Sequence, residues 1–289
     1  MIVQLIISGL AIGSVYALLA LAMVLIHKAT DVVNFAQGEM AMFTTFLCFA
    51  LLHGLGLPVL LVFLLSLPIG FLLGAVIERV IIQPIATDPP VNLLIVTIGL
   101  FIIFNNLAGA IWGYDPHTFP SLFSKEPMDL LGARVASNSV GMIVVAVLVM
   151  GSLYLFFEKT REGTAMRAAS MNRRAARLMG ISVPRVWMMS WGLAGAIGGV
   201  AGVLTAPMTF LDFEMMVAVL LKAFAGAILG GFNSLPGAVL GGLVIGLLET
   251  MFGALVSTAF KDTFAFCIII LVLMIRPTGL FGRSGIKKV

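Results

Sequence analysis

The chain has 289 residues, of which 61% are hydrophobic and only 10% are charged, and its formal net charge is +4. The mean hydropathy is +1.14, and runs of about 20 apolar residues, the length that a helix needs to cross a bilayer core, recur along the sequence. This composition excludes a soluble domain and predicts an all-α polytopic membrane protein. Nucleic-acid binding is not indicated, because the basic residues lie where membrane topology places them.

The apolar runs predict the membrane segments in chain order. They lie at about 5–26, 38–52, 58–77, 91–112, 138–157, 186–204, 215–230, 237–256 and 263–275. The proline-containing stretch 78–90 predicts a loop, and residues 113–137 predict a long, ordered outer loop. The segments 38–52 and 215–230 are short, so we expect them to be broken or re-entrant and not full crossings.

The stretch 158–185 is the longest polar run in the chain and sets the predicted topology. Short loops rich in Lys and Arg stay on the cytoplasmic side, and this one carries Lys159, Arg161, Arg167, Arg173, Arg174, Arg177 and Arg185. Counting outward from it predicts about eight transmembrane helices, with the N-terminus outside and the C-terminus inside. Lys28, Arg79 and the basic tail 276–289 then fall inside, whereas Lys125, Arg134 and Lys261 fall outside.

The two halves of the chain share a weak pattern. Each has a span, a break with acidic residues, a short apolar segment, and a span with two glycines four residues apart followed by a glutamate. The equivalent residues are Gly70, Gly74 and Glu78 in the first half and Gly242, Gly246 and Glu249 in the second. Equivalent spans run in opposite directions by the count above. Inverted repeats with broken segments are typical of transporters, and the breaks indicate the pathway; chance similarity between glycine-rich spans is the alternative.

The basic stretch has two interpretations. An apolar stripe at helical spacing, formed by Ala165, Met166, Ala169, Ala176 and Met179, predicts a short amphipathic helix. Its cations either anchor the topology and contact anionic lipid, or the helix, flanked by Gly163 and Gly180, sits in a groove of a cytoplasmic partner. The sequence has no G-x-x-x-x-G-K-[ST] phosphate loop. An ATPase that drives transport is therefore expected to be a separate polypeptide.

The first polar break contains NFAQGE. Asn34 predicts an N-cap with Gln37 as its capping-box partner, and a second span that begins at Phe35. A helix N-terminus inside a membrane protein also suits passing carboxylates. We therefore regard Asn34, Phe35, Gln37 and Glu39 as candidates for the translocation pathway.

Lys222 lies in the apolar run VAVLLKAFAGAIL. A cation at membrane depth is expensive and normally faces a partner or a wet cavity, so Lys222 is a pathway candidate with Glu249 or Glu214 as its partner. The alternative is snorkelling to an interface. In either case Lys222 is not expected to face lipid.

Catalysis is not indicated. His27, His53 and His117 are isolated on different segments, Cys48 and Cys267 fall in apolar runs, and no serine lies in a nucleophile-elbow context. The sequence predicts no metal site and no cofactor in this chain.

Four runs resemble one family in order. They are GLAIGSVYALLALAMVLIHKATDVVNFAQGEMAMF, REGTAMRAASMNRRAARLMGI followed by Pro184, KAFAGAILGGFNSLPGAVLGGLVIGLLE and RPTGLFG. Together they are similar to the permease subunit of branched-chain amino-acid ABC importers, over essentially the whole chain. The chain departs from the family at Gln37, where His is usual, and at Asn233, where Gly is common.

The resemblance implies one permease domain, 1–289, in a bacterial inner membrane. It implies a second related permease, two cytoplasmic ATPases that carry ATP and Mg, a periplasmic solute-binding protein, and a small-molecule substrate. The stretch 158–185 would be the coupling helix, with Arg161, Gly163, Arg167, Arg173, Arg174, Arg177 and Gly180 as its contact residues.

The predicted function is import of branched-chain or other hydrophobic amino acids, or related small amides or carboxylates. The alternative is a secondary transporter in which Glu39, Glu78 and Glu249 couple an ion. That alternative leaves the long basic stretch unexplained.

Overall fold

The computed structural model describes residues 2–85, 90–124, 126–130, 133–276 and 279–282. Its helices and strands are α1 (Ile2–Thr30), α2 (Gln37–Gly54), α3 (Val59–Ile77), α4 (Pro90–Trp112), β1 (Pro127–Leu130), β2 (Ala133–Ala136), α5 (Ser137–Lys159), α6 (Arg161–Met171), α7 (Arg173–Leu178), α8 (Val183–Thr209), α9 (Val217–Gly230), α10 (Leu235–Leu255) and α11 (Lys261–Ile275). The prediction of an all-α membrane protein is confirmed. The one sheet in the described residues is the antiparallel β1–β2 hairpin in the predicted outer loop.

Six helices are long and apolar enough to cross a membrane: α1, α3 with its extension to Ile85, α4, α5, α8 and α10. The segments predicted to be short are short: α9 has 14 residues, and α2 has 18 but begins with the polar residues Gln37 and Glu39. The stretch 78–90, predicted to be a loop, instead continues α3 as a π-helix over Glu78–Ile82 and a 3₁₀ turn over Gln83–Ile85. Residues 86–89 of that stretch, Lys125 and the tail 283–289 lie outside the described residues.

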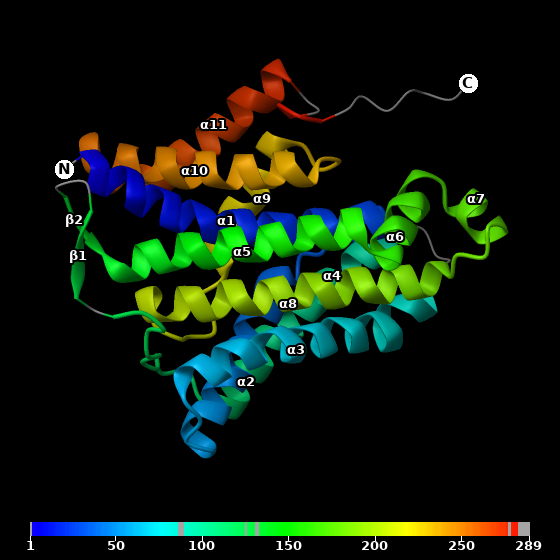
Figure 1. Ribbon diagram of the computed structural model, residues 1–289, viewed down its shortest axis with the longest axis horizontal. Coiled ribbons are helices and arrows are strands. Elements are labelled where there is room, and N and C mark those ends of the chain that lie inside the picture. The colour runs from blue at the N-terminus through cyan, green and yellow to red at the C-terminus, as the bar shows by residue number, and fades with distance from the viewer. Residues whose placement is uncertain (1, 86–89, 125, 131–132, 277–278, 283–289) are drawn as a thin grey trace.

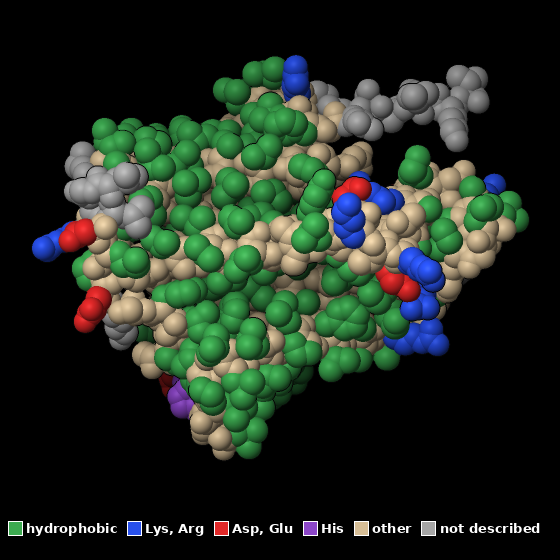
Figure 2. Space-filling model, in the orientation of Figure 1, with side chains coloured by type: hydrophobic (Ala, Val, Ile, Leu, Met, Phe, Trp, Pro, Cys, Tyr) green, Lys and Arg blue, Asp and Glu red, His purple; other side chains and the backbone are tan. Residues whose placement is uncertain are grey.

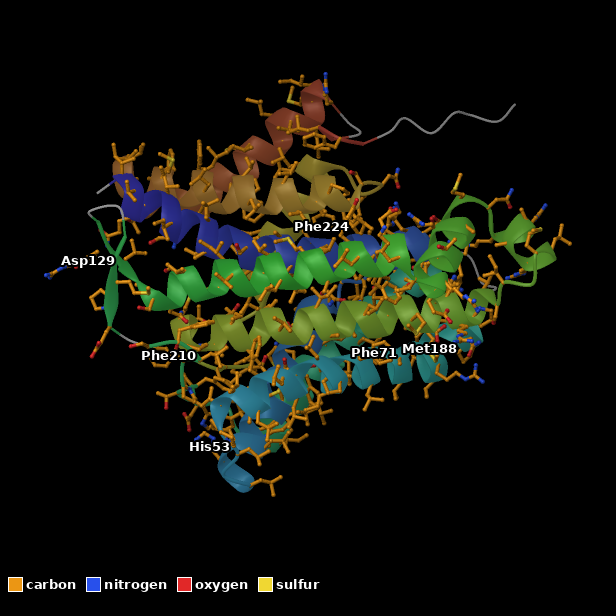
Figure 3. All side chains as sticks on the ribbon, viewed as in Figure 1. His53, Phe71, Asp129, Met188, Phe210 and Phe224 are labelled. Atoms are coloured by element: carbon orange, nitrogen blue, oxygen red, sulfur yellow. The ribbon has the colours of Figure 1, made fainter. Side chains whose placement is uncertain are left out.

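The long helices run along the longest axis of the molecule (Figure 1). The β1–β2 hairpin and the start of α1 lie at one end, here called the hairpin end, and α6 and α7 lie at the other, here called the coupling end. Figure 3 shows Asp129 at the hairpin end and Met188 toward the coupling end. The face seen in Figure 2 is hydrophobic between the two ends, and most of its charged side chains gather at the ends themselves. This is the distribution that a bilayer selects.

The predicted number of crossings needs a correction. Leu280 and Phe281 donate backbone N–H groups to the carbonyls of Leu229 and Gly230, near the coupling end, whereas α1 begins at the hairpin end. Termini on opposite sides require an odd number of crossings, so the predicted count of eight does not agree with the predicted placement of the termini. Six helices are long and apolar enough to cross, and α2, α9 and α11 are shorter or more polar. The number and the orientation of the crossings stay predictions.

The packing of the helices reproduces the predicted inverted repeat. Helix α1 packs on α10 as α8 packs on α3, α9 packs on α1 as α2 packs on α8, and α4 contacts α2 as α11 contacts α9. Exchanging α1–α4 for α8–α11 therefore preserves these contacts, although α10 also packs on α11 and no equivalent contact of that extent joins α3 to α4. Helix α5 with α6 and α7 joins the two repeats.

Glycines permit close approach at two of these contacts. A Cβ added at Gly74 would overlap the backbone of Trp191 in α8, and one added at Gly246 would overlap Gly13 in α1. Small residues at such positions let helix backbones approach closely, which is a main source of helix association in a bilayer. The glycine pattern found in the sequence thus marks the α3–α8 and α1–α10 interfaces.

Each repeat is broken after its first helix. Asp31, with φ 58°, follows α1, and Phe210, with φ 67°, follows α8; they are the two non-glycine residues with positive φ in the described chain. Residues 31–36 and 210–216 then enter the bundle without regular helix, and α2 and α9 begin inside it. The two helix starts meet, because Gly38 lies against Met216 and Leu220.

Candidate translocation and coupling sites

The first candidate site is the junction of the α2 and α9 N-termini. The helix α2 begins at Gln37 with Ala36 as its N-cap, and neither α2 nor α9 has a side-chain cap. The predicted capping box is therefore wrong. Asn34 instead accepts a hydrogen bond from the N–H of Ala36 at 3.0 Å, a local turn that ends the extended segment. Uncapped first-turn N–H groups carry the positive end of the helix dipole.

The side chains at this junction differ in how well they are satisfied. Gln37 is fully buried; its amide donates to the carbonyl of Ala194 in α8 at 2.9 Å and accepts from the Asn34 amide at 3.2 Å. Phe35 lies against Phe224, with ring centroids 6.0 Å apart. Gln37 therefore fastens α2 to α8, and its hydrogen-bonding capacity is used within the protein.

Glu39 is fully buried two residues further along α2. Neither carboxylate oxygen meets hydrogen-bond geometry with a described residue. The Asn105 amide and the Glu214 carboxylate are its polar neighbours. A buried carboxylate gains stability from a cation beside it, so this position suits a passing cationic group.

Lys222 lies in a buried ion-pair cluster. Its Nζ is 2.6 Å from Glu249 Oε1 and 2.7 Å from Asp262 Oδ1, and the Tyr16 hydroxyl donates to Glu249 Oε2 at 3.0 Å. The cluster joins α9 to α1, α10 and α11. Lys222 is only 8% exposed, which confirms that it does not face lipid and excludes snorkelling.

The predicted Glu249 partner is confirmed, and the Glu214 partner is wrong. The eight-residue spacing between Glu214 and Lys222 assumed one continuous helix, but α9 begins at Val217. Asp262 and Tyr16 were missed. Asp262 belongs to a turn that the sequence placed outside, and no pattern in α1 distinguishes Tyr16.

The second candidate site is the coupling segment, α6 and α7. The predicted single amphipathic helix is two helices, because Asn172 ends α6 and its side chain accepts from the N–H groups of Arg174 and Ala175 to begin α7. Of the predicted apolar stripe, Met166, Ala169 and Ala176 are buried. Met179 is 82% exposed, because α7 ends at Leu178.

Glycines shape both ends of this segment. Gly163 lies so close to α5 that a Cβ would overlap the Phe156 carbonyl. Gly180, with φ 80°, ends α7 and turns the chain toward α8. The segment is thus held tightly on α5 at its start and ends in a glycine turn.

The arginines of the coupling segment divide into two groups. Arg173 binds Asp31 at 2.7 Å and the carbonyl of Ala29 at 3.0 Å, and lies over the Trp187 ring. Arg167 pairs with Glu158 at 2.5 Å. These two fasten the segment to α1, α8 and α5.

Arg161, Arg174 and Arg177 are exposed. Near Arg174 and Arg177 the large apolar side chains Met171, Leu178 and Met179 are each more than 80% exposed. An exposed cluster that mixes large apolar side chains with cations is typical of a protein-binding surface.

Comparison with known proteins decides the family. Residues 5–273 match the family described as branched-chain amino acid transport system / permease component. The chain belongs to this family. The permease is 32% identical to the high-affinity branched-chain amino acid transport system permease protein LivH of Salmonella typhimurium, over 98% of this chain and 96% of the relative. It is 32% identical to the permease protein BraD of Pseudomonas aeruginosa over 99% and 97%, and 32% identical to the probable LivH of Methanocaldococcus jannaschii over 93% and 89%. No solved structure gives a significant match.

Family membership confirms several predictions. The chain is a multi-pass inner-membrane permease subunit of the ABC importer class, and it is not an enzyme. The secondary-transporter alternative is not supported. The family implies ATPase and solute-binding partners.

Proposed function

We propose that this permease moves branched-chain or other hydrophobic amino acids, or related small amides or carboxylates, across the inner membrane. The observation that carries the proposal is the 32% identity over nearly the whole length to permeases named for branched-chain amino acid transport. The meeting of the α2 and α9 starts inside the bundle supports a route at that point.

In this proposal the full importer combines the chain with a second related permease, two cytoplasmic ATPases that bind ATP and Mg, and a periplasmic solute-binding protein. The solute is a small molecule. This chain, as one domain over 1–289, supplies half of the pathway. Accessibility of the pathway alternates as ATP binding draws the ATPases together.

The pathway runs past the junction of α2 and α9. The uncapped helix starts offer N–H groups to a substrate carboxylate, and Glu39 offers a negative side chain to an ammonium group. Asn34, Phe35 and Gln37 hold the shape of the α2 start, and Lys222 with Glu249 holds the position of α9.

The coupling segment docks on an ATPase through its exposed cluster. Arg161, Arg174 and Arg177 meet an acidic groove, and Met171, Leu178 and Met179 enter it. Arg167, Arg173, Gly163 and Gly180 act from the permease side, because they hold the segment on the bundle and set its turn.

Reconstituted uptake tests the proposal. The permease with its partner subunits is placed in liposomes, and ATP-dependent uptake of labelled leucine is measured with the binding protein present. We expect saturable uptake that stops without ATP. Absence of uptake for every branched-chain or hydrophobic amino acid that the binding protein retains would refute the substrate class.

Charge reversal tests the docking surface. In the variant Arg174→Glu/Arg177→Glu two attractive contacts become repulsive, which at an exposed surface corresponds to roughly 2 kcal/mol, or about thirtyfold in affinity for the ATPase. The remaining cations of 158–185 keep the topology. We expect normal membrane levels, reduced co-purification of the ATPases and loss of uptake. The control Arg134→Glu, at the hairpin end, is expected to keep ATPase co-purification and uptake. If the double variant also kept both properties, the docking role would be refuted and the stretch 158–185 would serve only to anchor the topology.

A further inference from the structure

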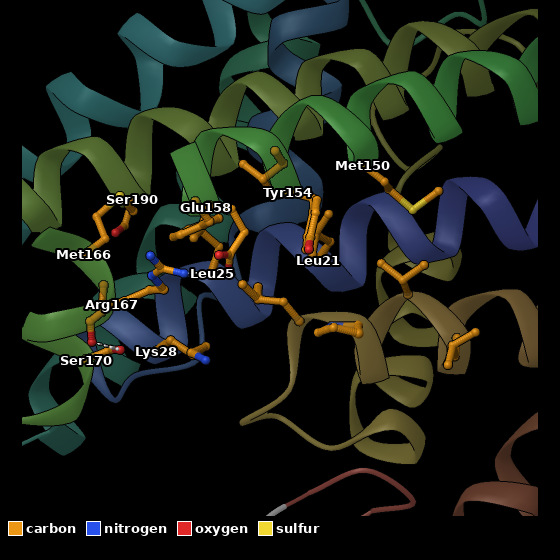
Figure 4. Close-up of a pocket in the computed structure, with 17 residues that line it drawn as sticks. Leu21, Leu25, Lys28, Met150, Tyr154, Glu158, Met166, Arg167, Ser170 and Ser190 are labelled. Carbon is orange, nitrogen blue, oxygen red and sulfur yellow. Dashed lines mark hydrogen bonds and ion pairs between the residues drawn. The ribbon is translucent and has the colours of Figure 1, made fainter. Parts of the chain in front are cut away.

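A groove lies along α1 between α5 and α10, near the coupling end (Figure 4). Its cavity volume is about 490 Å³. Leu21 and Leu25 form the floor, Met150 and Tyr154 of α5 line one side, and Leu240 of α10 lines the other. The groove is therefore a long apolar trough whose walls belong to both repeats and to the helix that joins them.

The groove ends in polar and cationic groups at the depth of the coupling segment. Lys28 comes from the end of α1, and Arg167 and Ser170 come from α6. Lys28 Nζ is 3.4 Å from the carbonyl of Asn233, and Arg167 pairs with Glu158. Two cationic side chains, Lys28 and Arg167, therefore lie at this end of the groove.

The exposed surface around the groove suits lipid. The outward side chains of its walls are apolar along the membrane depth, including Val147 and Leu148 of α5 and Val244 of α10. A different face carries exposed polar groups within the membrane, at Asn106 of α4 and Glu214 before α9. Polar groups at that depth require protein or water, so that face, and not the groove, is expected to meet the second permease.

We propose that the groove is a binding site for an anionic phospholipid, whose acyl chain lies between α5 and α10 and whose phosphate contacts Lys28 and Arg167. Basic pockets between transmembrane helices on the cytoplasmic side are suited to anionic head groups. From the cationic end of the groove, the apolar trough runs along α1 toward the middle of the bundle, which is the direction that an acyl chain takes in a bilayer. Because Arg167 belongs to α6, the bound lipid also touches the coupling segment. The assignment is independent of which solute the permease carries.

The test is retention of lipid by the full chain, purified in detergent with the subunits that accompany it. Native mass spectrometry compares binding of phosphatidylglycerol and phosphatidylcholine with the same acyl chains. We expect the wild type to prefer phosphatidylglycerol. The variant Lys28→Gln/Arg167→Gln removes both cations. We expect phosphatidylglycerol to bind to it at least about fivefold more weakly, which is the effect of one cation near a lipid head group. The effect of one cation is used, and not of two, because Glu158 already offsets part of the charge of Arg167.

Two further variants separate this site from general effects. Leu240→Trp fills the trough and leaves both cations in place, and we expect it to lose phosphatidylglycerol as well. The matched control Arg79→Gln/Arg185→Gln removes two cations at the same end outside the groove, one of them ion-paired as Arg167 is, and is expected to bind like the wild type. Equal retention of the two lipids by the wild type, an equal loss in the control, or undiminished binding to Leu240→Trp would overturn the proposal. So would cross-linking of a protein subunit to Leu240→Cys.

Discussion

Replacing Lys222 tests the buried cluster most directly. In Lys222→Leu, Glu249 keeps its burial, with 5% of the residue exposed, and loses its cation. Removing one partner of a buried pair typically destabilises by about 3–5 kcal/mol. Asp262 behaves differently because 57% of its side chain is exposed, so Asp262→Asn is expected to cost about 1 kcal/mol or less. Tyr16→Phe removes a hydrogen bond to a charged group, which corresponds to about 1.5–3 kcal/mol.

Thermal unfolding of the purified variants measures these differences, and a double-mutant cycle isolates the pair. We expect Lys222→Leu and Glu249→Leu each to lower the melting temperature strongly. The double variant Lys222→Leu/Glu249→Leu should recover most of the loss, because an apolar pair leaves no buried charge unpaired. If the two single losses simply added in the double variant, or if Lys222→Leu were no worse than Asp262→Asn, the ion pair would not be what holds α9 in place.

Two further predictions concern topology and coupling. In a Cys48→Ala/Cys267→Ala background, Asp129→Cys should react with an impermeant thiol reagent from outside intact cells and Ser170→Cys only after permeabilisation; labelling of both from one side would refute the opposite placement of the hairpin and coupling ends. Arg173→Gln should keep ATPase binding, since Arg174 and Arg177 remain exposed, and should lower uptake at saturating ATP because the tie to Asp31 is lost; unchanged uptake would show that this tie does not transmit motion.

The sequence predicted the membrane segments well because burial in a bilayer depends on composition. The spans 91–112 and 138–157 differ from α4 and α5 by at most a residue or two at each end. The glycines of the repeat pattern lie where α3 meets α8 and α1 meets α10, although the sequence did not indicate which helices they would bring together. The helical continuation of α3 past Glu78 was not predictable from the prolines. A π-helix over Glu78–Ile82 and a 3₁₀ turn over Gln83–Ile85, which contains Pro84, continue the chain there without a loop.

Side-chain partners were harder to predict. Lys222 was identified because a cation in an apolar run is conspicuous, and Glu249 was one of the two carboxylates named as its candidate partner. Asp262 and Tyr16 depend on how α11 and α1 pack around α9, which no local pattern reports. The same limit applies to Arg173: the sequence counted it among seven similar cations, and only the fold distinguishes it as the one bound to α1.

The two breaks connect the pathway to both sides of the membrane. A sparsely populated positive-φ conformation at a non-glycine residue costs on the order of 1–3 kcal/mol, and contacts from other parts of the chain lie beside both Asp31 and Phe210. Asp31 is bound by Arg173 of α7 at 2.7 Å. Leu211, next to Phe210, exchanges two backbone hydrogen bonds of 2.9 Å with His117 in the predicted outer loop. In the proposed transport cycle we expect a displacement of α7 to reach the start of α2 through residues 31–36, and a displacement of the outer loop to reach the start of α9 through residues 210–216. Such an arrangement would suit alternating access, because each of the two helix starts is tied to a different side of the membrane.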